Sequence, residues 1–267
     1  MTQRLRDTET DSMRQKLTIL ILLFLFSVTI QAQNNDRKFI EDTRNSYSLL
    51  RRQGLLEVRA SIIPNWQIML KDVSPKDKPA VLRLSNRLRF TLEADTKGNI
   101  NVTHSIIGSK PNKATADALD NLAKSVDLSV TGFLMSWAPF MLSELIPENL
   151  EQFVLQDLES QRLLTFKVKE VEVSVAITKD FEIKELRTAQ GAIKPILRKS
   201  KDGFVLTGYE GNNEDPVVGT VVIKARIESI PTQGVLLPKT VVVSGSAGQA
   251  PINFELHFAN YRLKRRI

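Results

Sequence analysis

The pattern of apolar and polar positions divides the chain into one long helix and a series of strands. Between Ala114 and Leu145 the apolar residues recur every three or four positions, which predicts an amphipathic helix. From Leu128 to Ser143 there is no charged residue, and apolar side chains lie all round the predicted helix. A helix of this kind is buried in a core, lies in a membrane or fills a cavity.

Alternating apolar and polar residues predict strands on both sides of this helix. Before it, the alternation favours a strand over 56–62, with a second piece through 66–70, and a hairpin over 88–106. After Pro147, short turns separate alternating runs up to the end of the chain, and a phase slip at Lys169 indicates a bulge or a tight turn. A second helix is expected over residues 36–52, and the connection over residues 71–79 is polar.

These elements indicate the fold class. Strands that follow one another through short turns pair in an antiparallel sheet, and one apolar face per strand means that one face of the sheet is covered. About nine to eleven strands are expected, and a sheet of this width coils on itself. We therefore expect an α+β fold: a large curved antiparallel sheet, or incomplete β-barrel, covered by helices on its concave face. Residues 33–267 form a single domain in this interpretation.

Residues 1–32 have the features of a secretory signal peptide. Arg14 and Lys16 precede an uncharged run, Leu17–Ile30, and Ala32 offers a small residue at a cleavage point. Residues 1–12 make this leader unusually long, which suggests that translation begins at Met13. The protein is then expected to be periplasmic or secreted, and the alternative is that residues 17–30 form an N-terminal membrane anchor.

Charge and composition narrow the choice of partners. The net charge of +7 favours contact with an anionic membrane surface. Basic residues do not interleave with aromatic ones, so nucleic acid is not an expected partner. The absence of cysteine excludes a disulfide framework and a thiol nucleophile.

The sequence contains no catalytic constellation. His104 lies on the apolar face of its strand, where a hydrogen-bonded core residue is the simplest interpretation, and His257 lies on a polar face. Two scattered histidines without cysteine do not make a zinc site, and neither a nucleophile elbow nor a phosphate loop is present. We expect no catalytic residue, no metal and no cofactor, and hence a protein that is not an enzyme.

What remains is an excess of apolar surface on the central helix. Gly132 and Pro139 weaken a helix, so this segment is a candidate for a lid that moves over a cavity. The alternative is a helix that fills the interior and leaves no cavity. The residues predicted to line an apolar cavity come from the lid and from the sheet: Phe133, Leu134, Trp137, Phe140, Met141, Phe90, Leu92 and Val102.

The order of elements resembles a known family. A signal peptide, an N-terminal helix, a strand, a hairpin, a buried helix and a run of antiparallel strands occur in this order, and the chain ends in Gly234–Pro238 followed by Ile252–Tyr261. This layout is similar to that of the periplasmic lipoprotein-carrier superfamily (LolA/LolB-like and LppX-like). The resemblance implies a half β-barrel that encloses acyl chains in an apolar cavity.

Two functions follow as expectations. The first is a non-catalytic cell-envelope binding protein that holds and transports a lipid or an acylated protein, as a monomer. The alternative is an envelope interaction or scaffold protein with the same fold, a packed interior and no ligand.

Overall fold

The computed structural model describes residues 34–266. The predicted signal peptide over 1–32, including the possible start at Met13, lies outside these residues. The chain divides into two units, residues 1–43 and residues 44–267. The described part of the first unit is helical. The second unit contains the sheet.

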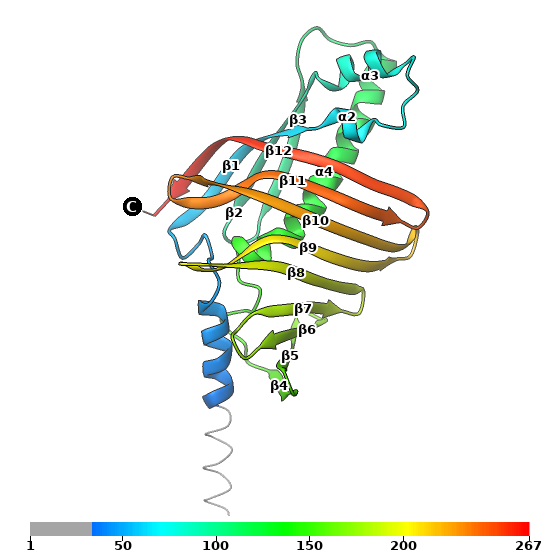
Figure 1. The fold of residues 1–267 in the computed structure, drawn as a ribbon. Coiled ribbons are helices and arrows are strands. Elements are labelled where there is room, and N and C mark those ends of the chain that lie inside the picture. Colours follow the sequence, from blue (N-terminus) through cyan, green and yellow to red (C-terminus); the bar gives the residue numbers. More distant parts are fainter. Residues whose placement is uncertain (1–33, 267) are drawn as a thin grey trace, which may run out of the picture. The chain divides into compact units, whose positions relative to one another are not determined.

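Twelve strands form one antiparallel sheet in the order β3-β2-β1-β12-β11-β10-β9-β8-β7-β6-β5-β4. The sheet is curved and does not close, so β3 and β4 lie at its two edges (Figure 1). The predicted α+β fold class is therefore confirmed. The strands are β1 (Leu55–Pro64), β2 (Leu88–Asp95), β3 (Ile100–Ile106), β4 (Phe153–Asp157), β5 (Gln161–Val168), β6 (Val171–Thr178), β7 (Ile183–Thr188), β8 (Gly191–Ser200), β9 (Gly203–Asp215), β10 (Gly219–Thr232), β11 (Val235–Ala247) and β12 (Ala250–Arg265).

The central helix α4 (Lys113–Met141) passes behind the strands in Figure 1, along the concave face of the sheet. Asn112 caps its first turn, because the side-chain oxygen accepts a hydrogen bond of 2.9 Å from the Thr115 N–H. The face of α4 that meets the sheet is apolar, and the Phe133 ring lies 6.0 Å from the ring of Phe258 on β12. This contact layer between α4 and the sheet forms the core.

The connection between β1 and β2 differs from the prediction. The expected strand over 66–70 is the short helix α2 (Trp66–Met69), and the expected polar connection contains α3 (Lys78–Ser85). Pro64 ends β1, after which the Asn65 carbonyl accepts hydrogen bonds from the N–H groups of Ile68 and Met69 at 3.1 and 3.2 Å. A single helical turn has too few residues to show a helical period in the sequence.

The predicted helix over 36–52 also ends early. Helical structure stops at residue 45, and the next residues pair with β9 instead. The Ser46 carbonyl accepts a hydrogen bond of 2.7 Å from the Phe204 N–H, and the Ser48 N–H donates one of 3.0 Å to the Phe204 carbonyl. Residues 46–54, which we call the strap, then reach α4, where the Leu50 N–H donates to the Met141 carbonyl at 2.8 Å. The strap therefore links β9 to the end of α4.

Candidate functional site

The residues predicted to form the lid all lie on the sheet-facing side of α4. Their side chains are buried: Phe133, Trp137, Phe140 and Met141 are each 2% exposed and Leu134 is 0% exposed. From the sheet, Phe90 and Leu92 are buried as well, and Val102 on the edge strand β3 is half-buried. The structure thus brings these residues into one packed layer, and their role in holding a ligand stays a prediction.

The prediction that the second half of α4 is buried on every side is wrong for one face. Met135 is 68% exposed and Leu128 is 74% exposed. They lie seven residues apart, on the side of the helix that faces away from the sheet. The sheet curves round only part of the helix circumference, and the rest of α4 remains in contact with solvent.

α4 does not cover the whole concave face. Under α4 lies a row of four buried residues, one from each of the neighbouring strands β12, β11, β10 and β9. Each residue pairs with the next in the strand register: Phe254, Val243, Ala225 and Tyr209. The next row on the same face is only half-buried. It runs across six strands from β12 to β7, and we call it the apolar row: Ile252, Gly245, Ile223, Gly211, Ile193 and Leu186.

Two glycines give the apolar row its shape. A Cβ atom at Gly245 would lie 1.9 Å from the Val222 carbonyl oxygen, so no side chain fits there. A Cβ atom at Gly211 would lie 3.2 Å from Cγ1 of Ile223. Isoleucine side chains on β8, β10 and β12 therefore alternate with bare backbone on β9 and β11, and this surface is apolar and uneven.

The side of α4 next to this surface consists of small residues. Ser125, Ser129, Gly132 and Ser136 follow one another at spacings of three or four, which places them along one flank of the helix. Each serine hydroxyl donates to the carbonyl four residues earlier, at 3.1, 2.8 and 3.2 Å. A hydrogen bond between Ser136 and Tyr209 shows that this flank meets β9. The apolar row therefore lies next to a flank of α4 that has small side chains. The serine hydroxyl groups of this flank are already hydrogen-bonded within the helix.

The opposite flank of α4 is held by a histidine. Nδ1 of His104 on β3 lies 2.9 Å from Oδ2 of Asp127, and Nε2 lies 3.7 Å from Oδ1 of Asp120. His104 is thus hydrogen-bonded, as its position in the strand predicts, but it is half-buried and not a core residue. The pair fixes the distance between the edge strand and the helix.

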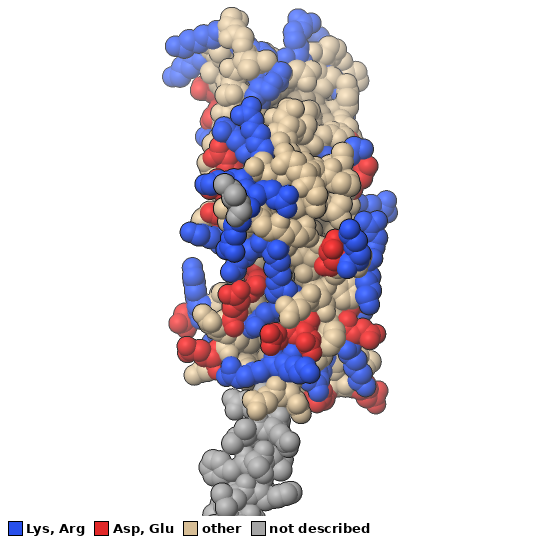
Figure 2. Space-filling view, turned by 90° about the vertical axis from the view of Figure 1, so that its left-hand side faces the viewer, with Lys and Arg blue, Asp and Glu red and all other residues tan. Residues whose placement is uncertain are grey.

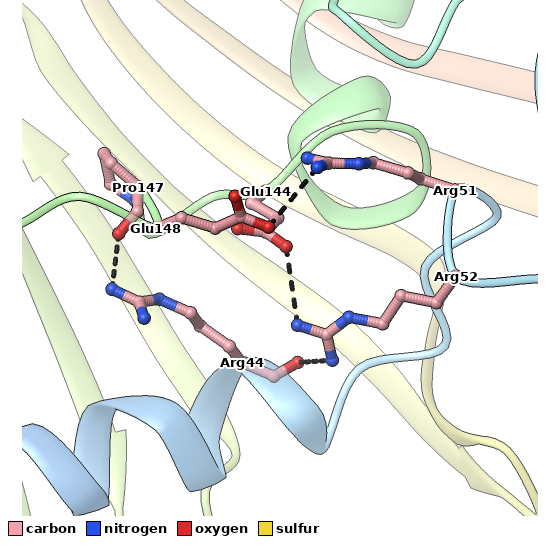
Figure 3. A network of polar contacts seen from close by, with 6 residues as sticks. All are labelled: Arg44, Arg51, Arg52, Glu144, Pro147 and Glu148. Carbon is pink, nitrogen blue, oxygen red and sulfur yellow. Dashed lines mark hydrogen bonds and ion pairs between the residues drawn. The ribbon is translucent and has the colours of Figure 1, made fainter.

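A polar network holds the strap to the loop after α4 (Figure 3). Arg52 donates to the Arg44 carbonyl at 2.8 Å and lies 3.4 Å from Oε1 of Glu144, whose side chain is 9% exposed. Arg51 pairs with Glu148 at 3.3 Å, and there both side chains are exposed. The Arg44 guanidinium donates to the Pro147 carbonyl. These contacts restrain the end of α4 that carries most of the predicted lid residues.

In residues 34–266, the part of the chain that the structure describes, no group of three or more histidine, cysteine, aspartate or glutamate side chains is arranged to hold a metal ion. No helix there is both long enough and apolar enough to cross a bilayer.

No family model, no curated protein and no solved structure matches the chain.

The apolar row was not predicted from the sequence. Its residues come one from each of six strands, and two of them are glycines, so no stretch of sequence carries its signal. Only the strand register brings them together. Ile193 belongs to β8, a strand that was not predicted, and its neighbours in the sequence are small or polar.

Proposed function

We propose that this protein is a non-catalytic binding protein that holds an apolar ligand, such as the acyl chain of a lipid or of an acylated partner, against the apolar row. The observation that supports the proposal is the half-buried state of this row on the concave face, beside a helix whose sheet-facing side is fully packed. Large apolar side chains that stay partly exposed inside a concave surface favour an apolar ligand.

The dimensions of the row suit a chain-like ligand. Six neighbouring strands are separated by five steps of roughly 4.8 Å, so the row is about 24 Å long. Covering apolar surface contributes roughly 25 cal/mol per Å². In this proposal the ligand lies beside α4, and Phe133, Trp137 and the other predicted lid residues meet it only if the helix moves away from the sheet.

The finer assignment is a LolA/LolB-like carrier in the periplasm or outside the cell. The open sheet with a helix on its concave face is compatible with that layout. A basic run at the end of β12 and just after it supports contact with an anionic membrane: Arg262, Lys264, Arg265 and Arg266. Figure 2, which views the molecule from that side, shows many Lys and Arg side chains among fewer acidic ones.

Native mass spectrometry of the protein purified from its own cells tests the proposal. A lipid-sized adduct is expected, and organic extraction then identifies its class. The matched variants are Ile223→Asp, in the apolar row, and Val222→Asp, on the opposite face of the same strand, where Val222 is 49% exposed. The adduct should be lost from the first variant and kept in the second. Equal loss in both, or an adduct that survives Ile223→Asp in a folded protein, would contradict a ligand on this row.

The burial of every predicted lid residue on α4 favours a second function, the interaction or scaffold protein with a packed interior. In that case the purified protein has the mass of its polypeptide alone and takes up no fluorescent fatty acid. Uptake of the fatty acid by the wild-type protein, together with its loss in Ile223→Asp, would exclude this alternative.

A further inference from the structure

A pocket lies on the convex face, away from the apolar row. It has a volume of about 570 Å³ and lies over β12, β1, β2 and the turn between β2 and β3. Its floor includes the backbone of these strands, and its walls are side chains that point away from the core. The charged ones are Glu57, Arg59, Glu93, Asp95, Arg262 and Lys264.

All three carboxylates of this pocket already have partners. Glu57 pairs with Lys264 at 2.9 Å, and Glu93 pairs with Arg59 at 3.2 Å. The Asp95 carboxylate accepts a hydrogen bond of 2.7 Å from the side-chain amide of Asn99, and bonds of 2.9 and 3.0 Å from the backbone N–H groups of Lys97 and Asn99. These bonds outweigh its slight burial and hold its pKa below the usual value. The lining therefore has no carboxylate left for a further cation.

Arg262 is the cation of the pocket lining that has no carboxylate partner. Its side chain forms no hydrogen bond or ion pair with any residue in the described range, 34–266. It stands directly opposite Arg59 in the β1–β12 ladder. Like charges in this position repel each other, and Glu93 compensates only Arg59. The charged side chains of the lining sum to zero, because three carboxylates stand with three cations, but an anion bound at Arg262 would pair with this guanidinium directly and offset its repulsion with Arg59.

The backbone at this point is irregular. The ladder steps from Arg59↔Arg262 to Ser61↔Ala259, so β12 has one residue more than β1 there. Asn260 in this bulge has φ 55, a left-handed conformation that asparagine tolerates better than most residues. Bulges turn the neighbouring side chains and are common beside binding sites. Here the bulge immediately precedes Arg262.

We infer that the pocket is a binding site for a small polar molecule that carries one carboxylate or phosphate group. A guanidinium binds such groups through two parallel hydrogen bonds. The amide of Asn101, which also lines the pocket, offers hydrogen bonds to hydroxyl groups of the same molecule, whereas the Asn99 amide already donates to Asp95 at 2.7 Å. A pocket of this volume accommodates a small molecule. Because the site lies on the opposite face of the sheet, it does not depend on a ligand at the apolar row.

Titration of the full protein with glucose 6-phosphate, glucuronate and neutral glucose, followed by amide NMR shifts, tests the inference. We expect the two anions, and not glucose, to shift residues 57–59, 93–101 and 262–264. Arg262→Gln should weaken binding roughly tenfold to hundredfold, the effect of losing hydrogen bonds to a charged group. Arg226→Gln is the matched control, since Arg226 is exposed on the same face of β10 and makes no contact with the pocket.

A further titration with phosphatidylglycerol vesicles distinguishes the source of the anion. Vesicle binding that depends on Arg262 but not on Arg226, without binding of the soluble probes, would assign the site to a lipid head group. Equal weakening by both substitutions, shifts spread over the whole surface, or no binding to any probe would overturn the inference. Thermal unfolding of both variants shows whether they are folded.

Discussion

The phenolic oxygen of Tyr47 accepts a hydrogen bond of 2.7 Å from the backbone N–H of Ile183, 136 residues further along the chain. Both residues are buried, and the Tyr47 ring also lies 5.5 Å from the ring of Phe204. This one side chain therefore connects the strap with β7 and β9.

Tyr47→Phe should lower the free energy of unfolding by about 1–3 kcal/mol, because it leaves the buried Ile183 N–H without an acceptor. Urea unfolding measures the effect. Phe204→Leu serves as a comparison, since it removes the ring contact and keeps the hydrogen bond. Unchanged stability in Tyr47→Phe would mean that the Ile183 N–H donates its hydrogen bond to a water molecule in the variant.

Alkaline pH should unfold the protein steeply. Burial raises the pKa of Tyr47, Tyr209 and Tyr261 above the ordinary value of 10.0. Below pH 10 the phenols are protonated in both states, so their contribution to stability is complete. Above pH 10 the unfolded state releases protons that the folded state retains, and stability falls by about 1.4 kcal/mol per pH unit for each tyrosine.

Unfolding free energies measured between pH 9 and pH 12 check this expectation. Tyr47→Phe should reduce the slope by about 1.4 kcal/mol per pH unit, the contribution of one tyrosine. A slope that is the same in the variant would show that Tyr47 ionises at its ordinary pKa in the folded protein.

Phe133→Ala should lower the free energy of unfolding by about 3–5 kcal/mol, because the ring is buried between α4 and the sheet and leaves a cavity. Met135→Ala, two residues away on the exposed face, should change it by no more than about 0.5 kcal/mol. Thermal unfolding compares the two. A small loss in Phe133→Ala would indicate that the space under the helix is already loosely packed, as the predicted cavity requires.

Arg52→Ala should lower the free energy of unfolding by about 1–3 kcal/mol, since it deprives the buried Glu144 carboxylate of its cation. Adding Glu144→Gln should recover part of that loss. Arg51→Ala breaks the ion pair with Glu148, in which both side chains are exposed. It should lower the free energy of unfolding by about 1 kcal/mol or less. Equal losses for the two arginines would mean that burial of Glu144 does not matter.

Much of the fold could be predicted because its signals are local. α4 shows its period over 29 residues, and Asn112 marks its start. Most strands alternate clearly, and the predicted phase slip corresponds to the turn between β5 and β6, where Lys169 has φ 55. The helices α2 and α3 escaped prediction because α2 is a single turn and α3 follows a lysine- and proline-rich connection.

The candidate sites were harder to predict, for a physical reason. Alternation showed which side chains of each strand face the core, but not which of them α4 covers. Val243 and Gly245 face the same way, and only the position of the helix separates a buried residue from a half-buried one. The pocket at Arg262 depends likewise on a register in which β1 lies beside β12.

Because β1 pairs with β12, the sheet cannot be completed before the last strand has been synthesised. The ion pair between Glu57 and Lys264 joins residues 207 positions apart, so β1, β2 and β3 cannot join the main sheet until almost the whole chain has been synthesised. Contacts between such distant residues slow folding. A nascent chain that lacks β12 leaves β1 and β11 as two unpaired strand edges, each of which can pair with another chain. The protein is therefore most vulnerable to aggregation in the interval before its last strand is in place.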